Sequence, residues 1–257
     1  MKQKIYDIYG KEIFSPIHGY PTKIKEKYLY PRLKLRYYKN RLKYGKAAPN
    51  PFEIIYVDPE DIEYYKYRND YYFVASDKHK FKKWKDAGKI KEGNWDKLET
   101  KIDEMPKYRA VKQHFEEGVS WEETRIYDHM LKMIEVNGSA DGCTNRKDLE
   151  ERYNRIDNLY ENIKDSGYKR QSEINKNRGW KAKLDEITVS IGRKGDFIFG
   201  DGGGWHRLSI AKILNLEEIP VRVLVRHKKW QEKRSKVLDH PRSIDNKHLN
   251  HPDINFD

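Results

Sequence analysis

The sequence predicts an α/β fold of the α+β type, in which a small mixed sheet carries a buried helix and the chain adds a helical insertion. Three observations lead to this prediction. Residues 196–226 change from a short apolar run to a glycine turn, then to a helical period and then to a strand-like alternation. Short alternating runs at 52–57 and 187–191 supply further strands. Between 106 and 164, apolar residues recur at helical spacing instead.

The central stretch 196–226 contains the most informative pattern. Phe197–Phe199 predict a strand, and Gly202–Gly204 predict a tight turn that uses positive φ angles. From Leu208 onward the apolar spacing is helical, and Asn215 is the expected end of that helix. The order strand, glycine turn, helix places the turn at a helix N-terminus.

This turn offers a site for an anion. A glycine loop before a helix leaves main-chain N–H groups without helical acceptors, and the helix dipole adds partial positive charge there, so phosphates bind at such ends. Arg207 supplies a planar set of donors, and His206 supplies a donor that also carries protons. Asp201 supplies a carboxylate that binds Mg²⁺ or acts as a base. The expected nucleotide-binding residues are Gly202, Gly203, Gly204, Trp205, His206 and Arg207; the catalytic candidates are Asp201 and His206; the metal ligand is Asp201.

The alternative is a turn with only a structural role. Three glycines before a helix also make a sharp turn, Asp201 also caps a backbone N–H, and Arg207 also pairs with an acidic side chain. Three polar side chains at one turn favour the binding site over this alternative.

Gly203-Gly204-Trp205-His206-Arg207, with Ile219-Pro220 downstream, resembles the signature of the ParB/sulfiredoxin-like superfamily. Sulfiredoxins have Gly-Gly-Cys-His-Arg at the start of a helix and a later strand that begins with Ile-Pro. ParB partition proteins have Gly-Glu-Arg-Arg at the same place. In these relatives the turn binds nucleotide phosphates, so the resemblance implies that Gly204, His206 and Arg207 contact phosphate.

The chain departs from both family patterns at Trp205. Sulfiredoxins have their catalytic cysteine at this position, so sulfinic-acid repair is not expected. ParB has there the glutamate that helps to hold the metal, so a ParB-type CTP switch is not implied. Asp201, which precedes the turn, is the acid that would replace that glutamate.

Two further segments extend the resemblance. Residues 52–59 resemble the first strand of the family domain, which ends in a proline turn, and residues 156–168 resemble the helix before the signature, with its final glycine. The implied organisation has four parts. They are a basic N-terminal extension (1–51), a ParB/sulfiredoxin-like core (52–68 and 145–226), a helical insertion (69–144) and a polar C-terminal tail (227–257).

Composition limits the classes of protein. Among 257 residues, 37% are charged and 37% hydrophobic, but the aromatic content of 13% argues against disorder. A net charge of +12 favours phosphorylated or polyanionic partners. A single cysteine, Cys143, excludes an internal disulfide framework and favours a reducing compartment. Because no apolar run approaches the roughly 20 residues of a membrane helix, we expect a cytoplasmic protein without membrane contact.

A second candidate surface lies at residues 31–46, which are rich in bases and contain no acid. Pro31 suits the first turn of a helix, Gly45 suits its end, and 47–51 then reads as a linker. Such a helix fits a phosphate backbone, with tyrosines available for stacking. The alternative is a solvated helix that packs its tyrosines and leucines on the core. The expected nucleic-acid contacts are Arg32, Lys34, Arg36, Lys39, Arg41 and Lys43.

The remaining elements follow from local signals. A strand at 219–225, with Pro220 near its start, is expected to bury one face, and the basic stretch 169–183 is expected to be a loop.

Trp95 and Trp121 either line a substrate pocket or pack in the core of the insertion. His248 and His251 either present a metal site or lie in a mobile tail. The expected helices run from Pro106 to Gly118, from Ser120 to Gly138 and from Asn145 to Gly167; a hairpin joins 187–191 to 197–199.

The predicted function is nucleotide binding, with Mg²⁺ and ATP, ADP or CTP as ligands and with phosphoryl transfer or nucleotide hydrolysis as the chemistry. The alternative is a DNA- or RNA-binding ParB-like protein or nuclease. It would use the bases of 31–46 and 226–236, with the glycine turn only structural. The sequence leaves the oligomeric state open.

Overall fold

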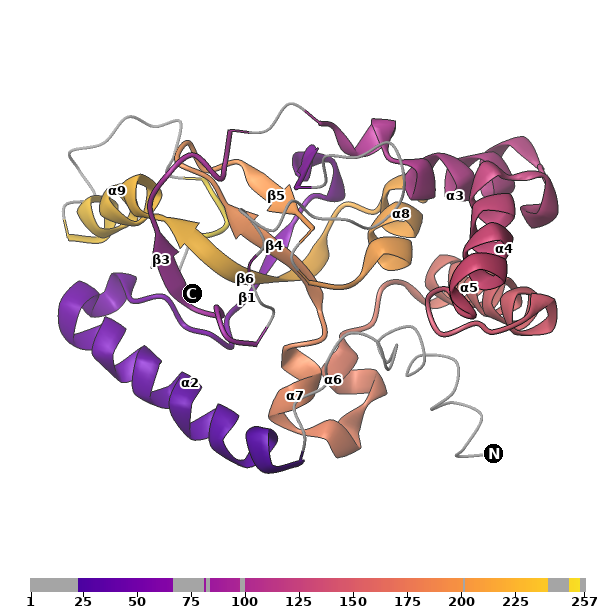
Figure 1. The fold of residues 1–257 in the computed structure, drawn as a ribbon. Helices are drawn as coiled ribbons and strands as arrows, with labels where there is room; N and C mark the ends of the chain where they lie inside the picture. Colours follow the sequence, from indigo (N-terminus) through magenta and orange to yellow (C-terminus); the bar gives the residue numbers. More distant parts are fainter. Residues whose placement is uncertain are drawn as a thin grey trace.

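A computed structural model of the protein describes residues 23–66, 81, 84–97, 100–200, 202–239 and 250–254. This part of the chain has a mixed α/β architecture with a six-stranded mixed sheet and helices on both of its faces (Figure 1). The predicted fold class is therefore confirmed. Two positions named in the predictions, Asp201 and His248, lie outside the described residues.

Five strands have the order β1-β6-β4-β5-β2, and β3 pairs with the far part of β6. β4 is parallel to β6 and antiparallel to β5, β1 is antiparallel to β6, and β2 is parallel to β5. As a result β1, β2 and β5 end, and β4 and β6 begin, at one end of the sheet, which we call the turn end. The strands are β1 (Ile54–Val57), β2 (Tyr64–Tyr65), β3 (Lys89–Lys91), β4 (Ile187–Ile191), β5 (Phe197–Phe199) and β6 (Ile219–His227).

Helices cover both faces of the sheet. The α-helices are α2 (Lys23–Tyr44), α3 (Pro106–Glu117), α4 (Arg125–Asn137), α5 (Arg146–Ser166), α6 (Gln171–Ile174), α7 (Trp180–Lys183), α8 (Trp205–Ile213) and α9 (Lys228–Asp239). Short 3-10 helices lie at Gly45–Ala47, Pro59–Asp61, Ile102–Glu104, Trp121–Glu123 and Lys176–Arg178. No described helix combines the length and the apolar character needed to cross a membrane.

The central strands are buried on both faces, which differs from the single buried face predicted for 219–225. All nine residues of β6 are buried. Val221 and Val223 pack in a cluster with Leu208 of α8, whereas Leu224 packs with Leu33 of α2 on the other face. β6 has strands on both sides and helices above and below, so neither of its faces meets solvent.

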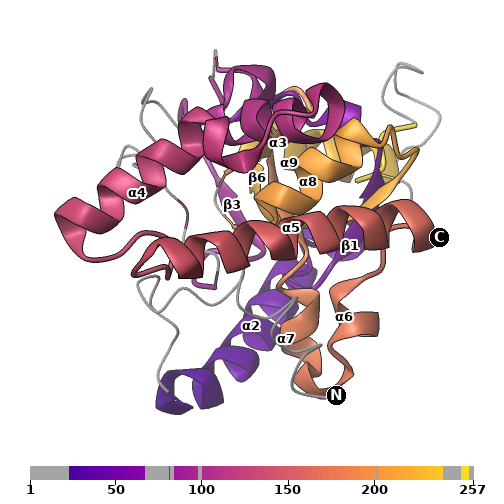
Figure 2. The ribbon, with the colours of Figure 1, turned by 90° about the vertical axis from the view of Figure 1, so that its right-hand side faces the viewer.

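α3, α4 and α5 form a helical layer beside α8, and α5 runs along α8 (Figure 2). Their shared core includes Val111, Tyr127, Ile156 and, from α8, Ile210. The predicted boundaries of α3 and α5 and the end of α4 are confirmed, but the helix expected from Ser120 begins as a separate 3-10 helix, and α4 itself begins at Arg125. Gly118 and Gly138 take positive φ at the ends of α3 and α4, the capping box of Ser120 and Glu123 is present, and Asn145 caps α5.

Four local predictions were wrong. α2 begins at Lys23 rather than Pro31, so the proline lies inside the helix, and Gly45 follows its end as expected. Residues 169–183 contain α6 and α7 instead of a loop. Residues 47–49 and 51 are buried rather than exposed in a linker, and the Ala47 carbonyl accepts a hydrogen bond from Gln231 at 2.7 Å. At 169–183 and 47–51, burial of residues such as Gln171, Ala182 and Ala47 shows that tertiary packing overrode the local signal.

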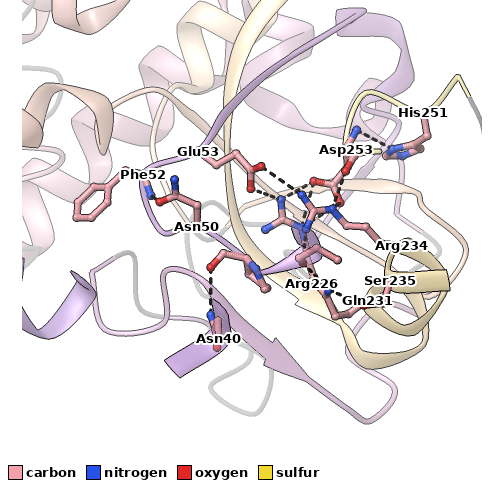
Figure 3. Close-up of polar contacts among 12 residues, drawn as sticks. Asn40, Asn50, Phe52, Glu53, Arg226, Gln231, Arg234, Ser235, His251 and Asp253 are labelled. Carbon is pink, nitrogen blue, oxygen red and sulfur yellow. Dashed lines mark hydrogen bonds and ion pairs between the residues drawn. The ribbon is translucent and has the colours of Figure 1, made fainter. Parts of the chain in front are cut away.

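The fourth error concerns the C-terminal region, where a polar tail was expected at 227–257. β6 continues to His227, α9 follows, and Trp230 is fully buried. Arg226 and Arg234 share Glu53 and Asp253, with 2.6 Å between Arg226 Nη2 and Glu53 Oε2 and 3.2 Å between Arg234 Nη2 and Glu53 Oε1 (Figure 3). We call these four residues the C-terminal ion cluster. Two positive and two negative groups compensate each other there, which allows Arg226, Arg234 and Asp253 to be buried beside the half-buried Glu53.

Candidate functional site

The predicted glycine turn lies between β5 and α8, at the turn end of the sheet. Gly204 precedes the helix with φ 103°, and its carbonyl accepts the N–H of Leu208 at 2.8 Å. Because Gly204 has no side chain, no side-chain cap satisfies the first N–H groups of α8. All three glycines are half-buried rather than buried. The start of α8 thus presents uncapped main-chain N–H groups, which suits binding of an anion.

Packing against β4 also requires glycine at two of the three positions. A Cβ atom at Gly202 would lie 2.2 Å from Cβ of Thr188, and one at Gly204 would lie 2.8 Å from Cγ1 of Ile187. Both distances are far below a normal contact. Gly202 and Gly204 are therefore needed for close packing on β4 whether or not a ligand binds, which is what the structural alternative predicts.

Trp205 is the first residue of α8, and its indole packs on neighbouring aromatic rings. Its ring centroid lies 4.1 Å from that of Phe199 and 5.9 Å from that of Tyr65, both in edge-to-face geometry. The side chain is half-buried. It therefore anchors the start of α8 to β5 and β2.

Arg207 faces the interior, which differs from the predicted contact with phosphate. It is 5% exposed, and its Nη2 donates to the carbonyl of Asp185 at 2.6 Å. Its Nη1 donates to Tyr168 Oη at 2.9 Å and lies 3.5 Å from Glu186 Oε2. The guanidinium thus joins α8 to the residues before β4 and after α5. This is the pairing with an acid that the structural alternative anticipated.

Glu186 is the residue at this site that sequence reasoning missed. It is 1% exposed and accepts the N–H of Gln171 at 2.5 Å. Burial raises the pKa of Glu186 to about 7, and the charge of Arg207 opposes this shift only in part. Burial also raises the pKa of Tyr168. An acidic pair, Asp185 and Glu186, directly before a buried strand was the signal available in the sequence.

His206 is the second residue of α8 and lies close enough to Asp141, beside the helical layer, to affect its pKa. It is 8% exposed. Asp141 is half-buried in this layer, with 3.1 Å between its Oδ2 and Lys107 Nζ and 3.3 Å to Arg152 Nη2. Burial opposes ionisation of Asp141, but Lys107 and Arg152, with a smaller contribution from His206, lower its pKa. The predicted roles of His206 as phosphate donor and proton carrier would require its side chain to leave this environment.

A small cavity borders Arg207 on the side away from the glycine turn. Its volume is about 30 Å³, and its lining includes Gly167, Tyr168, Lys169 and Gln171. That volume holds about one water molecule. This cavity is therefore too small for a nucleotide.

The other predicted residues are divided between surface and core. Arg32, Lys34, Lys39, Arg41 and Lys43 are exposed on α2, whereas Arg36 is half-buried and donates to the Ala87 carbonyl at 2.6 Å. Trp95 and Trp121 are buried, so they pack rather than line an open pocket. His251 Nδ1 accepts the N–H of Asp253 at 3.0 Å. Among the described residues, no group of three His, Cys, Asp or Glu side chains could hold a metal ion.

Comparisons of the chain with protein-family models, curated proteins and solved structures found no match. The resemblance of the glycine turn to the ParB/sulfiredoxin-like signature therefore remains a prediction from the residues of the turn.

Proposed function

We propose that the glycine turn binds a phosphate group of a nucleotide, ATP, ADP or CTP, together with Mg²⁺. The observation that carries this proposal is the start of α8: a half-buried glycine loop leads into a helix whose first N–H groups have no side-chain cap. Such groups bind phosphate oxygens, and the helix dipole adds to the attraction.

In this proposal the main chain of residues 203–206 contacts the ligand, and Arg207 acts as a positioning residue. Its two hydrogen bonds and its contact with Glu186 hold the first turn of α8 against β4. The side-chain contacts expected from sequence, His206 and Arg207 on phosphate, would need both groups to turn outward. Asp201, outside the described residues, is proposed as the ligand that shares Mg²⁺ with the nucleotide.

The proposed chemistry is phosphoryl transfer or nucleotide hydrolysis. Such reactions depend mainly on positioning and charge neutralisation, which amide donors and Mg²⁺ provide. The measurement is release of inorganic phosphate from ATP or CTP with Mg²⁺, for the wild type and for Asp201→Asn. Turnover that Asp201→Asn abolishes supports catalysis, and equal turnover in both proteins contradicts the role of Asp201.

Binding is tested by calorimetric titration with ATP, ADP and CTP in the presence of Mg²⁺. Trp205 is the first residue of α8, a position that tolerates proline. Trp205→Pro removes one N–H at the site, whereas Trp205→Ala removes the same indole and keeps that N–H. The proposal predicts weaker binding for Trp205→Pro than for Trp205→Ala. Equal affinity of the two variants, or no saturable binding by the wild type, contradicts it.

Arg207→Ala requires a stability measurement beside the titration, because the change leaves Glu186 buried without its cation. A variant that remains folded and still binds would support the positioning role. A folded variant that loses binding would instead favour the direct phosphate contact predicted from sequence.

The alternative function is binding of DNA or RNA along α2, with the glycine turn only structural. It is supported by five exposed bases on this helix, Arg32, Lys34, Lys39, Arg41 and Lys43. Nucleic-acid binding that falls steeply with salt and is lost on neutralising these bases, but not in Trp205→Pro, would favour this alternative.

A further inference from the structure

The outward face of α2 carries a row of exposed apolar side chains. Tyr28, Leu35, Tyr38 and Leu42 are 66%, 56%, 59% and 90% exposed. With Pro31, which is also exposed, they follow one another at alternating steps of three and four residues. Single exposed apolar residues are common, but a continuous row indicates an interaction surface.

The same helix turns its opposite side to the protein. Leu33 is 1% exposed and packs in the cluster that includes Leu224. Asn40 Nδ2 donates to the Gly88 carbonyl at 2.9 Å, and Arg36 donates to the Ala87 carbonyl at 2.6 Å. With roughly 3.6 residues per turn, Leu33 lies opposite the apolar row. α2 lies along the outer side of the molecule (Figure 1), and the exposed row is on the side of the helix opposite the buried Leu33.

Bases flank the row on both sides. In a heptad register with the row at the a and d positions, Arg32 and Lys39 are at e, and Lys34 and Arg41 are at g. All four side chains are exposed, and residues 28–46 contain no acid. In paired helices the e and g residues select the partner by charge.

We infer that this outward face of α2, defined by Tyr28, Leu35, Tyr38, Leu42 and the flanking bases, binds an amphipathic helix of another protein with an apolar seam and acidic flanks. The exposed leucines bury apolar surface in such a complex, and acids at the partner's flanking positions meet the four bases. Because the backbone of α2 is already ordered on the sheet, only its exposed side chains, and not its main chain, lose conformational freedom on binding.

Other occupants fit this face less well. A second copy would set the bases of one α2 against those of the other. The three longest segments outside the described residues, 1–22, 67–80 and 240–249, each contain more Lys and Arg than Asp and Glu, so none supplies acidic flanks. Nucleic acid would neutralise the bases, but it offers no apolar surface to Leu42, which is 90% exposed.

The test uses the full chain and two labelled peptides of about three heptads. Both peptides have leucine at a and d; one has glutamate at e and g, and its matched control has lysine there. The inference predicts saturable binding of the glutamate peptide by fluorescence anisotropy and none of the lysine peptide. Binding of both peptides alike, or of neither, would overturn it.

Three variants locate the contact. Leu35→Ser/Leu42→Ser removes apolar surface, and a fourfold glutamine variant at Arg32, Lys34, Lys39 and Arg41 removes the flanking charge. Each is expected to weaken binding of the glutamate peptide by about tenfold or more. Val136→Ser changes a residue that is 80% exposed on α4 and is expected to leave binding unchanged. All changed side chains are exposed, so circular dichroism should show native folding of each variant.

Two results would assign the face to another occupant and overturn the inference. One is tighter binding of a labelled single-stranded oligothymidylate that only the charge variant weakens. The other is a dimer in sedimentation that Leu35→Ser/Leu42→Ser dissolves. Neither experiment involves the glycine turn, so its outcome is independent of nucleotide binding.

Discussion

Buried arginines join parts of this fold at two places, which differ in their balance of charge. In the C-terminal ion cluster, Arg226 and Arg234 face two carboxylates, Glu53 and Asp253. At the glycine turn, Arg207 lies 3.5 Å from one carboxylate, Glu186, and its closer contacts are with neutral oxygens.

The pKa shifts of the two groups have opposite directions. In the C-terminal ion cluster burial opposes ionisation, but Arg226, Arg234 and the hydrogen bond from Trp230 together outweigh it and lower the pKa of Asp253. At the glycine turn burial dominates, and the pKa of Glu186 rises to about 7. A carboxylate with close bidentate arginine contacts stays charged, whereas one with a single longer contact binds a proton near neutral pH. The C-terminal ion cluster therefore suits a permanent structural contact. The contact between Arg207 and Glu186 instead changes with the protonation of Glu186.

The largest effect is expected for Asp253→Ala, which leaves Arg226 and Arg234 buried without one of their two anions and removes the acceptor of Trp230 Nε1 at 2.8 Å. The free energy of unfolding should fall by about 3–5 kcal/mol. Urea denaturation measures it, with Asp165→Ala on the exposed side of α5 as the control. A loss as small as that of the control would contradict the role of the cluster.

The glycine turn should tolerate a methyl group poorly. Gly204→Ala adds a Cβ atom 2.8 Å from Ile187 Cγ1 at a residue with φ 103°. Overpacking and backbone strain together should lower stability by about 2–4 kcal/mol. Gly45→Ala is the matched control, because Gly45 has φ 52° and open space around it, so only the backbone cost of about 1 kcal/mol applies. Equal losses in thermal unfolding would show that close packing on β4 is unimportant.

The raised pKa of Glu186 predicts a pH dependence. The folded state holds this proton up to about pH 7, whereas the unfolded carboxyl releases it near 4.5. The resulting stabilisation is fully present below pH 4.5 and is lost as the pH rises to 7. Relative to Glu186→Gln, the wild type should lose about 2–3 kcal/mol of unfolding free energy between pH 4.5 and 8. Parallel stability profiles of the two proteins would contradict this prediction.

The smallest effect is expected for Tyr168→Phe, which removes the acceptor of Arg207 Nη1 at 2.9 Å but keeps the ring. Stability should fall by about 1 kcal/mol in urea denaturation. Tyr38→Phe, at an exposed residue of α2, serves as the control and should change nothing measurable. A neutral Tyr168→Phe would mean that this hydrogen bond contributes little to holding α8.

Local signals predicted much of the fold. Glycines predicted the C-terminal ends of α3, α4 and α5, alternation located β4, and a short apolar run located β5, because these features depend on neighbours in sequence. The C-terminal ion cluster could not be predicted from the sequence. Glu53 and Asp253 are two hundred residues apart, and only the completed sheet brings them to Arg226.

The site was predicted in part. The glycine turn and the helix after it are where the pattern placed them, although α8 begins at Trp205 rather than Leu208. The side-chain directions were not predictable, because the partner of Arg207 depends on where β4 begins and on the loop after α5. A polar residue beside a glycine turn therefore does not reveal whether it faces a ligand or the core.

The central claim, that main-chain amides at the start of α8 bind nucleotide phosphate, is tested most directly by ¹H–¹⁵N correlation spectra during titration with ATP and Mg²⁺. The proposal predicts saturable shifts of the amides of Gly203, Gly204, Trp205 and His206, with smaller changes at α2. Saturating shifts confined to α2, or no shifts at residues 203–206 at millimolar nucleotide, would contradict it.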